Sequence, residues 1–213
     1  MTRKIFATYT GIIIAVNVIA FLSFLVLVNI YGTGVTNYIA LQPEAAIAGK
    51  NLWTFLTSMF MHANLTHLFV NMVSLMFIGS FVERLIGKKR FLWLYFGGGI
   101  FAGLFFVLIA YFTGADLNIY AVGASGAIFA LGGLLAVLTP KLPVLVFFII
   151  PMPMWMAMIA LMGILWVLSL TLGIPIGNTA HLGGLLVGLC YGFYLRFKYP
   201  KKTQMISRYF AKD

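Results

Sequence analysis

The chain has 213 residues, of which 62% are hydrophobic and only 8% are charged, and so little charge excludes a soluble globular domain. Several apolar runs reach the roughly 20 residues that a helix needs to cross a hydrocarbon core about 30 Å thick. The formal net charge is +10, but the basic residues cluster at the ends of apolar runs, as membrane topology requires. The composition therefore predicts an all-α polytopic membrane protein and argues against nucleic-acid binding.

The apolar runs predict six transmembrane helices, at about residues 5–30, 65–86, 91–112, 121–139, 153–172 and 179–197. The first run is too long for the core of a signal peptide and lacks a small-x-small cleavage site, so we expect it to be retained. The long connection at 31–64 is rich in aromatic residues, which suit the membrane interface. Prolines interrupt the chain between the fourth and fifth spans, and we expect a loop or a partly embedded link over 140–152. We expect one domain over residues 1–213.

Lysine and arginine are distributed unevenly between the two sides that six spans define. Thirteen of them fall on the side of both termini, and only Lys50 falls on the other. This excess predicts cytoplasmic termini, an external loop at 31–64 and a basic cytoplasmic tail at 198–213 that lies at anionic headgroups of the bilayer. The single cysteine, Cys190, lies in the last apolar run, excludes an intrachain disulfide, and is expected to be a packing residue.

Polar residues occur in the first turns of the second, fourth and sixth spans, all of which would begin on the external side. The second span has His67 and Asn71 on one helix face, with His62 just before it. The fourth span has Ser125, and the sixth has His181. Ionisable groups inside a membrane are costly and usually mark function, although any one of these residues could be polar glue between helices.

The fourth helix is expected to start near Ser125 and to be only about 21 Å long at 1.5 Å per residue. Its external end should therefore lie below the membrane surface, at the base of a wet cavity that opens outward. Small residues such as Gly126 allow the sixth helix to pack closely, and His181, Gly184 and Gly188 share one face of that helix. This packing would bring His181 to Ser125.

A serine within hydrogen-bond reach of a neutral histidine is an activated nucleophile, because the imidazole takes the hydroxyl proton as attack occurs. We therefore consider Ser125 a candidate nucleophile and His181 its general base. His67, Asn71 and the Ser125 backbone N–H are candidate donors to an oxyanion. A carboxylate to orient the histidine is hard to find, so we expect a dyad, with Asn178 as a candidate orienting residue.

Together these residues resemble the rhomboid family of intramembrane serine proteases. The resemblance covers nearly the whole chain, in order and at compatible spacing. The matching motifs are G-x-S-G from Gly123 to Gly126, H-x-x-x-x-H-x-x-x-N at His62, His67 and Asn71, A-H-x-x-G-x-x-x-G at residues 180–188, and G-x-x-x-E-x-x-x-G at Gly79, Glu83 and Gly87.

The resemblance implies a rhomboid-like bundle of six transmembrane helices with a short central fourth helix. It implies that Ser125 is the nucleophile, His181 the general base, and His67 and Asn71 the oxyanion-hole side chains, with His62 a secondary position of the cavity. The implied reaction is hydrolysis of peptide bonds in or beside the transmembrane helices of protein substrates, without a metal or other cofactor. This minimal form is typical of bacteria or archaea, and so of a prokaryotic cell (inner) membrane.

Two positions depart from the family's pattern. Many members have Trp-Arg in the external loop, where this chain has Trp53-Thr54. Phe129 stands where some members have a tyrosine that packs on the catalytic histidine, so ring stacking can survive here but the hydroxyl's hydrogen bond cannot.

Functions other than proteolysis fit the sequence less well. A rhomboid-like protein that binds transmembrane helices without cutting them would not need both Ser125 and His181. A metal-binding transporter could use His62, His67 and His181, but no carboxylate or cysteine lies near them. Glu83 could carry protons, but a structural role near the interface is favoured. Methionines at 152, 154, 156 and 158 suggest a pliable fifth span that shifts to admit substrate.

Overall fold

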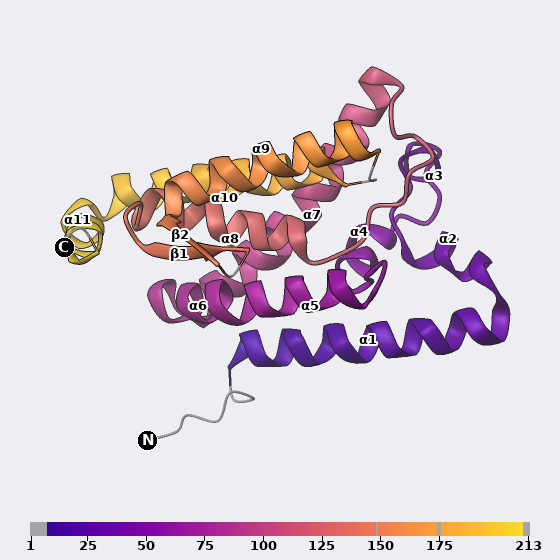
Figure 1. Cartoon of the computed structure of the whole chain (residues 1–213), viewed down its shortest axis with the longest axis horizontal. Helices are drawn as coiled ribbons and strands as arrows, with labels where there is room; N and C mark the ends of the chain where they lie inside the picture. The colour runs from indigo at the N-terminus through magenta and orange to yellow at the C-terminus, as the bar shows by residue number, and fades with distance from the viewer. Residues whose placement is uncertain (1–7, 148, 174–175, 211–213) are drawn as a thin grey trace.

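The computed structural model of the protein describes residues 8–147, 149–173 and 176–210 (Figure 1). The described chain is mostly helical, and its long helices lie together as a bundle. Four of them are long and apolar enough to cross a membrane, namely α1 (Tyr9–Tyr31), a continuous segment at Leu65–Ile86, α7 (Lys88–Thr113) and α9 (Met154–Leu172). The prediction of a polytopic helical membrane protein is confirmed at this level, and residues 5–7 of the first predicted span lie outside the described residues.

The second of these segments is not one uniform helix. It consists of α5 (Leu65–Ser74), a π-helical turn at Leu75–Gly79 and α6 (Ser80–Ile86). The side chain of Asn64 accepts a hydrogen bond from the His67 backbone N–H at 2.8 Å, which caps the start of α5.

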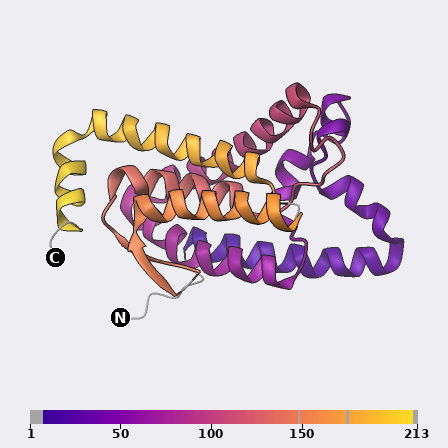
Figure 2. The ribbon, with the colours of Figure 1, turned by 45° about the horizontal axis from the view of Figure 1, so that its top comes forward.

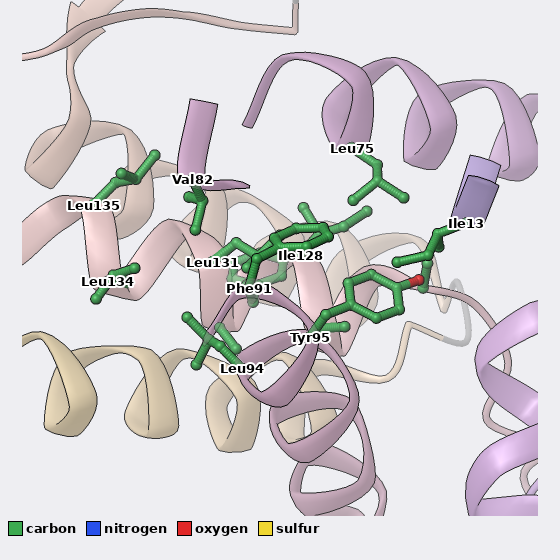
Figure 3. Packing of buried hydrophobic residues seen from close by; sticks show 14 of the residues in the cluster. Ile13, Leu75, Val82, Phe91, Leu94, Tyr95, Ile128, Leu131, Leu134 and Leu135 are labelled. Atoms are coloured by element: carbon green, nitrogen blue, oxygen red, sulfur yellow. The ribbon is translucent and has the colours of Figure 1, made fainter. Parts of the chain in front are cut away.

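The centre of the bundle is α8 (Ser125–Leu138), whose 14 residues are nearly all buried. It lies among α7, α9 and α10 (Asn178–Lys198) (Figure 1). Close by, apolar side chains of α7 and α8 pack together with Leu75 and Val82 of the second segment and Ile13 of α1 (Figure 3). Because α8 and α10 are not among the four helices that could span by length and composition, six spans stay a prediction.

Two glycines bring α10 against α8. A Cβ atom at Gly184 would overlap the Gly126 carbonyl oxygen, and one at Gly188 would overlap the Ala130 carbonyl oxygen. Only glycine permits this approach, since no side chain can occupy the space between the two helices at these points.

Helix α1 is attached at its N-terminus to the end of the second segment. The Glu83 carboxylate accepts hydrogen bonds from the backbone N–H groups of Tyr9 and Thr10 and from the Thr10 hydroxyl, at 3.1, 2.9 and 2.8 Å. A carboxylate is favourable there because it satisfies free N–H groups and faces the positive end of the helix dipole. Gly79 leaves room for Thr10, and Gly87, at φ +85°, makes the turn from α6 into α7.

The connection between α1 and α5 folds into short helical pieces and contacts the segment that leads into α8. Leu41 and Ala121 form an isolated antiparallel bridge with backbone hydrogen bonds of 3.1 and 2.8 Å. Thr54, the departure noted in this loop, donates its hydroxyl to the Asn51 carbonyl at 2.7 Å. The pieces are Thr33–Val35, α2 (Thr36–Ile39), α3 (Pro43–Ile47), α4 (Thr54–Thr57) and Ser58–Phe60.

The segment at 140–152 differs from the expected loop or link. It contains β1 (Pro143–Val146) and β2 (Ile150–Pro153), paired as an antiparallel hairpin. Proline has no backbone N–H to donate to a neighbouring strand. It is tolerated here because both strands of a two-stranded ribbon are edge strands, where an N–H on the outer side has no strand to bond.

The end of the chain also differs in detail from the prediction. The basic tail contains a further helix, α11 (Pro200–Tyr209), which turns sharply from the end of α10 (Figure 2). Proline suits the first helical position because no N–H is needed there. Cys190 on α10 is exposed, so the expectation of a packing role is wrong.

Candidate active site

The first turns of α8 and α10 bring together the serine and the last histidine of the sequence. Ser125 is the first residue of α8, and its Oγ lies 2.7 Å from His181 Nε2, within hydrogen-bond distance. The contact follows from the helix packing, because Gly184 and Gly188 lie on the same face of α10 as His181 and hold that face against α8.

The His181 ring is held largely by packing. It is 8% exposed and stacks on Phe129, with ring centroids 4.7 Å apart and planes inclined by 18°. Its buried Nδ1 has no hydrogen-bond partner among the described residues. The ring is therefore oriented by Phe129 on one face and by the Ser125 hydroxyl at Nε2.

Gly123 places a second histidine beside the serine. Its backbone has φ +113°, and its N–H donates to the Ser58 carbonyl at 2.9 Å. A Cβ atom at Gly123 would lie 2.8 Å from both Cε1 and Nε2 of His67 and 3.8 Å from Ser125 Oγ. The imidazole edge of His67 therefore lies directly over the backbone that leads into Ser125.

The protonation pattern of His67 can be inferred from its second nitrogen. The Ala63 backbone N–H donates to His67 Nδ1 at 3.5 Å, a long hydrogen bond. A neutral imidazole that accepts at one nitrogen carries its proton on the other. We therefore assign the proton to Nε2, the atom that faces Gly123.

Asn71 lies one turn after His67 on α5 and is 4% exposed. Its Nδ2 donates to the His67 carbonyl at 2.9 Å, and its buried Oδ1 has no partner in the described part of the chain. An amide nitrogen carries two hydrogens, so Asn71 keeps one for a further acceptor.

His62 supports His67 from the loop before α5. It is fully buried, and its ring meets that of His67 edge-on, with centroids 5.1 Å apart. Burial lowers the pKa of the His62 imidazole to about 4, with His67 adding to the effect and the Phe60 backbone opposing it. His62 is therefore neutral at physiological pH and acts on His67 through packing.

The remaining predicted residues lie at the margins of the site. A Cβ atom at Gly126 would meet that of Ala102 at 2.6 Å, so this glycine lets α7 approach α8. Asn178 Nδ2 lies 3.5 Å from the Leu165 carbonyl of α9, and this bond links α10 to α9 and does not reach His181. Within the ranges that the structure covers, no three His, Cys, Asp or Glu side chains are arranged to hold a metal ion.

Two supports of the site were missed by sequence reasoning. The Asn64 cap could have been found, because asparagine directly before a helical run is a common N-cap. The Ser58 carbonyl that holds Gly123 has no signal in the sequence, because any residue offers a backbone carbonyl.

A family model and the relatives of this chain carry the same family name. The family model described as the Rhomboid domain matches residues 49–198. The chain is 31% identical over 165 residues to RHOMBOID-like protein 6, mitochondrial, of Arabidopsis thaliana, covering 73% of this chain and 48% of that protein. It is 30% identical over 189 residues to Rhomboid protease GluP of Bacillus subtilis, covering 85% and 33%.

A third relative carries a different description. The Inactive RHOMBOID-like protein 8 of Arabidopsis thaliana is 36% identical over 90 residues, covering 42% of this chain and 24% of that protein. The chain thus spans less than half of the length of each of these three relatives.

Proposed function

The chain belongs to the rhomboid family, and from that premise we propose that it is an intramembrane serine endopeptidase. The resemblance first drawn from the sequence motifs is confirmed by the family model. Family membership indicates an integral membrane protein. The family includes a relative named as a protease, but it also includes a relative described as inactive. The proposal for this chain therefore depends on its own residues.

The observation that carries the proposal is the 2.7 Å distance between Ser125 Oγ and His181 Nε2. As Oγ attacks a peptide carbonyl carbon, Nε2 accepts the hydroxyl proton, and the carbonyl oxygen becomes an oxyanion. His181 then gives that proton to the departing amine, which leaves an acyl-serine. A water molecule, deprotonated by the same nitrogen, hydrolyses the acyl-serine and restores the hydroxyl.

Three donors are available for the oxyanion. The first N–H groups of a helix have no intrahelical partner, and Ser125 is the first residue of α8. His67 Nε2 and the second Asn71 hydrogen extend this set from α5. Such donors stabilise the negative charge only as it develops, which lowers the barrier and not merely the energy of the bound substrate.

The membrane placement is part of the proposal. The first turns of α5, α8 and α10 meet at one end of the bundle. Most basic residues of the described chain lie in α6, at the start of α7, at the end of α10 and in α11, towards the other end (Figure 1). The excess of basic residues away from the site supports an external active site and cytoplasmic termini. Six spans within one domain, in a prokaryotic cell membrane, are likewise part of the proposal. Substrates would be transmembrane proteins, cut in or beside a membrane helix at small residues.

The test uses a fluorophosphonate probe, which reacts only with an activated serine. We expect the full chain in detergent to be labelled, and labelling and cleavage of a model transmembrane substrate to be lost in Ser125→Ala and His181→Ala. Ser169→Ala in α9 is the matched control and should be labelled like the wild type. Wild-type protein that is folded but unlabelled would support the alternative, a rhomboid-like protein that binds transmembrane helices without cutting them.

The oxyanion donors have a separate test. We expect His67→Ala or Asn71→Ala to slow cleavage by about 10- to 10³-fold, as loss of one such donor usually does. Initial cleavage rates at saturating substrate measure the effect. Unchanged rates in both variants would remove this assignment while leaving Ser125 and His181 in place.

A further inference from the structure

A groove opens between α7 and α10, away from the proposed catalytic residues. Its volume is about 350 Å³, and it has an apolar lining with one cation at its edge. A Cβ atom at Gly97 would meet nothing within 4 Å, so this part of the groove is bare backbone. Trp93 forms one wall and is 80% exposed. The lining includes Arg90, Trp93, Gly97, Val187 and Tyr191.

Cations and tyrosine hydroxyls gather where this groove meets the end of α10. Arg90 Nη2 lies 3.5 Å from the Tyr199 hydroxyl, and its guanidinium lies 5.7 Å from the centroid of that ring. Lys198 Nζ donates to the Tyr194 hydroxyl at 2.8 Å, and the Tyr194 ring stacks on Tyr191, which lines the groove. Both cations are exposed, and no carboxylate among the described residues pairs with either.

The chemistry of the two parts specifies one class of ligand. An apolar groove on the outer face of a membrane helix suits an acyl chain. Cations beside hydroxyl donors suit a phosphate, to which they give charge-assisted hydrogen bonds. Arg90 is also in the first turn of α7, where the helix dipole disfavours a cation, so a bound anion would relieve that repulsion.

We propose that this groove binds one anionic glycerophospholipid. An acyl chain lies over Gly97 between Trp93 and Val187, and the phosphate lies between Arg90 and Lys198 with the Tyr191 hydroxyl near by. The site is independent of the proposed proteolysis, and its test needs no enzymatic readout.

The test uses Trp93 as a reporter in the full-length protein in non-ionic detergent. Phosphatidylglycerol or phosphatidylcholine with brominated acyl chains is titrated, and Trp93→Phe isolates the fluorescence of Trp93. We expect half-maximal quenching of Trp93 at an about 5- to 30-fold lower concentration of phosphatidylglycerol, as two cations near a headgroup would give. Arg90→Gln/Lys198→Gln should bring the ratio between the two lipids close to one.

Gly97→Leu should weaken quenching of Trp93 by both lipids, because the side chain fills open space and leaves the fold intact. Gly163→Leu on α9 is its matched control, since a Cβ there also meets nothing within 4 Å. Lys88→Gln/Lys89→Gln removes the same charge as the double variant above and should keep the preference. Thermal unfolding of each variant verifies folding.

Three results would overturn the proposal. The first is equal quenching of Trp93 by both lipids in the wild type. The second is an equal loss of preference in Lys88→Gln/Lys89→Gln, which would mean that overall charge is responsible. The third is loss of the preference in inorganic phosphate at matched ionic strength, which would indicate a site for free anions. Retention of the preference in that buffer supports a lipid.

Discussion

At the scale of single residues, the site depends on a missing side chain. Gly123 has a positive φ and leaves just enough space for the His67 ring beside the backbone that enters Ser125. Both requirements favour glycine, one through backbone strain and the other through contact. The effects of backbone strain and of the contact can be separated by comparison with a glycine that has a positive φ but no close neighbour.

We expect Gly123→Ala to lower the cleavage rate by at least about 10-fold, because the new methyl group would displace His67 and small misplacements of catalytic groups are costly. Gly114→Ala is the control, since Gly114 has φ +69° but a methyl group there would have no neighbouring atom within 4 Å. It should lose only about 1 kcal/mol of stability and keep its activity. Equal activities of the two variants would contradict the role given to the Gly123–His67 contact.

Helical spacing could predict which residues share a face, but loop contacts could not be read from the sequence. His181, Gly184 and Gly188 were placed on one face by their i, i+3 and i+7 spacing, and that face lies against α8. The Asn178 bond to α9 depends on how two helices meet across a connection, which spacing along one helix does not encode. The Ser58 carbonyl likewise comes from a loop whose path has no periodic pattern.

At the scale of elements, the N-terminus of α1 is capped by a carboxylate from α6. Its first backbone N–H groups are satisfied by Glu83, which is 5% exposed and lies on α6. This contact fixes how α1 enters the bundle, because the donors and the acceptor come from segments more than 70 residues apart.

We expect Glu83→Gln to lower the thermal unfolding midpoint by several degrees, corresponding to about 1–3 kcal/mol, because the amide accepts fewer hydrogen bonds and carries no charge. Differential scanning fluorimetry in detergent measures the change. Glu44→Gln, at an exposed carboxylate in α3, is the control and should shift the midpoint by less than a degree or so. A shift in Glu83→Gln no larger than that of the control would contradict the capping role.

Element boundaries were predicted well where a run is long and apolar on average, and poorly where it is short or strongly polar. The predicted span at 65–86 coincides with the segment Leu65–Ile86, because length and hydropathy suffice there. The hairpin β1–β2 was missed because its prolines argue against any regular structure except an edge strand. Helix α11 was missed because the tail was interpreted by its charge alone, and the tail has no long apolar run to mark a helix.

At the scale of the whole molecule, packing is unequal around α8. Only 11% of the apolar stretch of α9 is buried, compared with 39% for α7. Its buried residues are Met154, Ala157 and Met158, and the Met158 Sδ lies 2.5 Å from where a Cβ of Gly132 would be. Flexible methionine side chains can repack at low cost, so α9 is the element best suited to move.

We expect backbone amides of α9 to exchange with deuterium about 10-fold faster than those of α5 in detergent, because fewer buried contacts oppose local opening. Hydrogen exchange followed by mass spectrometry measures this, and peptides from α7 provide an internal reference. Protection of α9 equal to that of α5 would contradict the expectation that this span shifts to admit substrate.

The exposed thiol of Cys190 has a practical consequence for such measurements. Because the sequence contains no other cysteine, a nitroxide or fluorophore can be attached to the outer face of α10 without any prior substitution. With a second cysteine introduced on α9, the distance between the labels on the two helices can be measured by spectroscopy. The native sequence thus supplies one of the two attachment points needed to test in a bilayer whether α9 moves relative to α10.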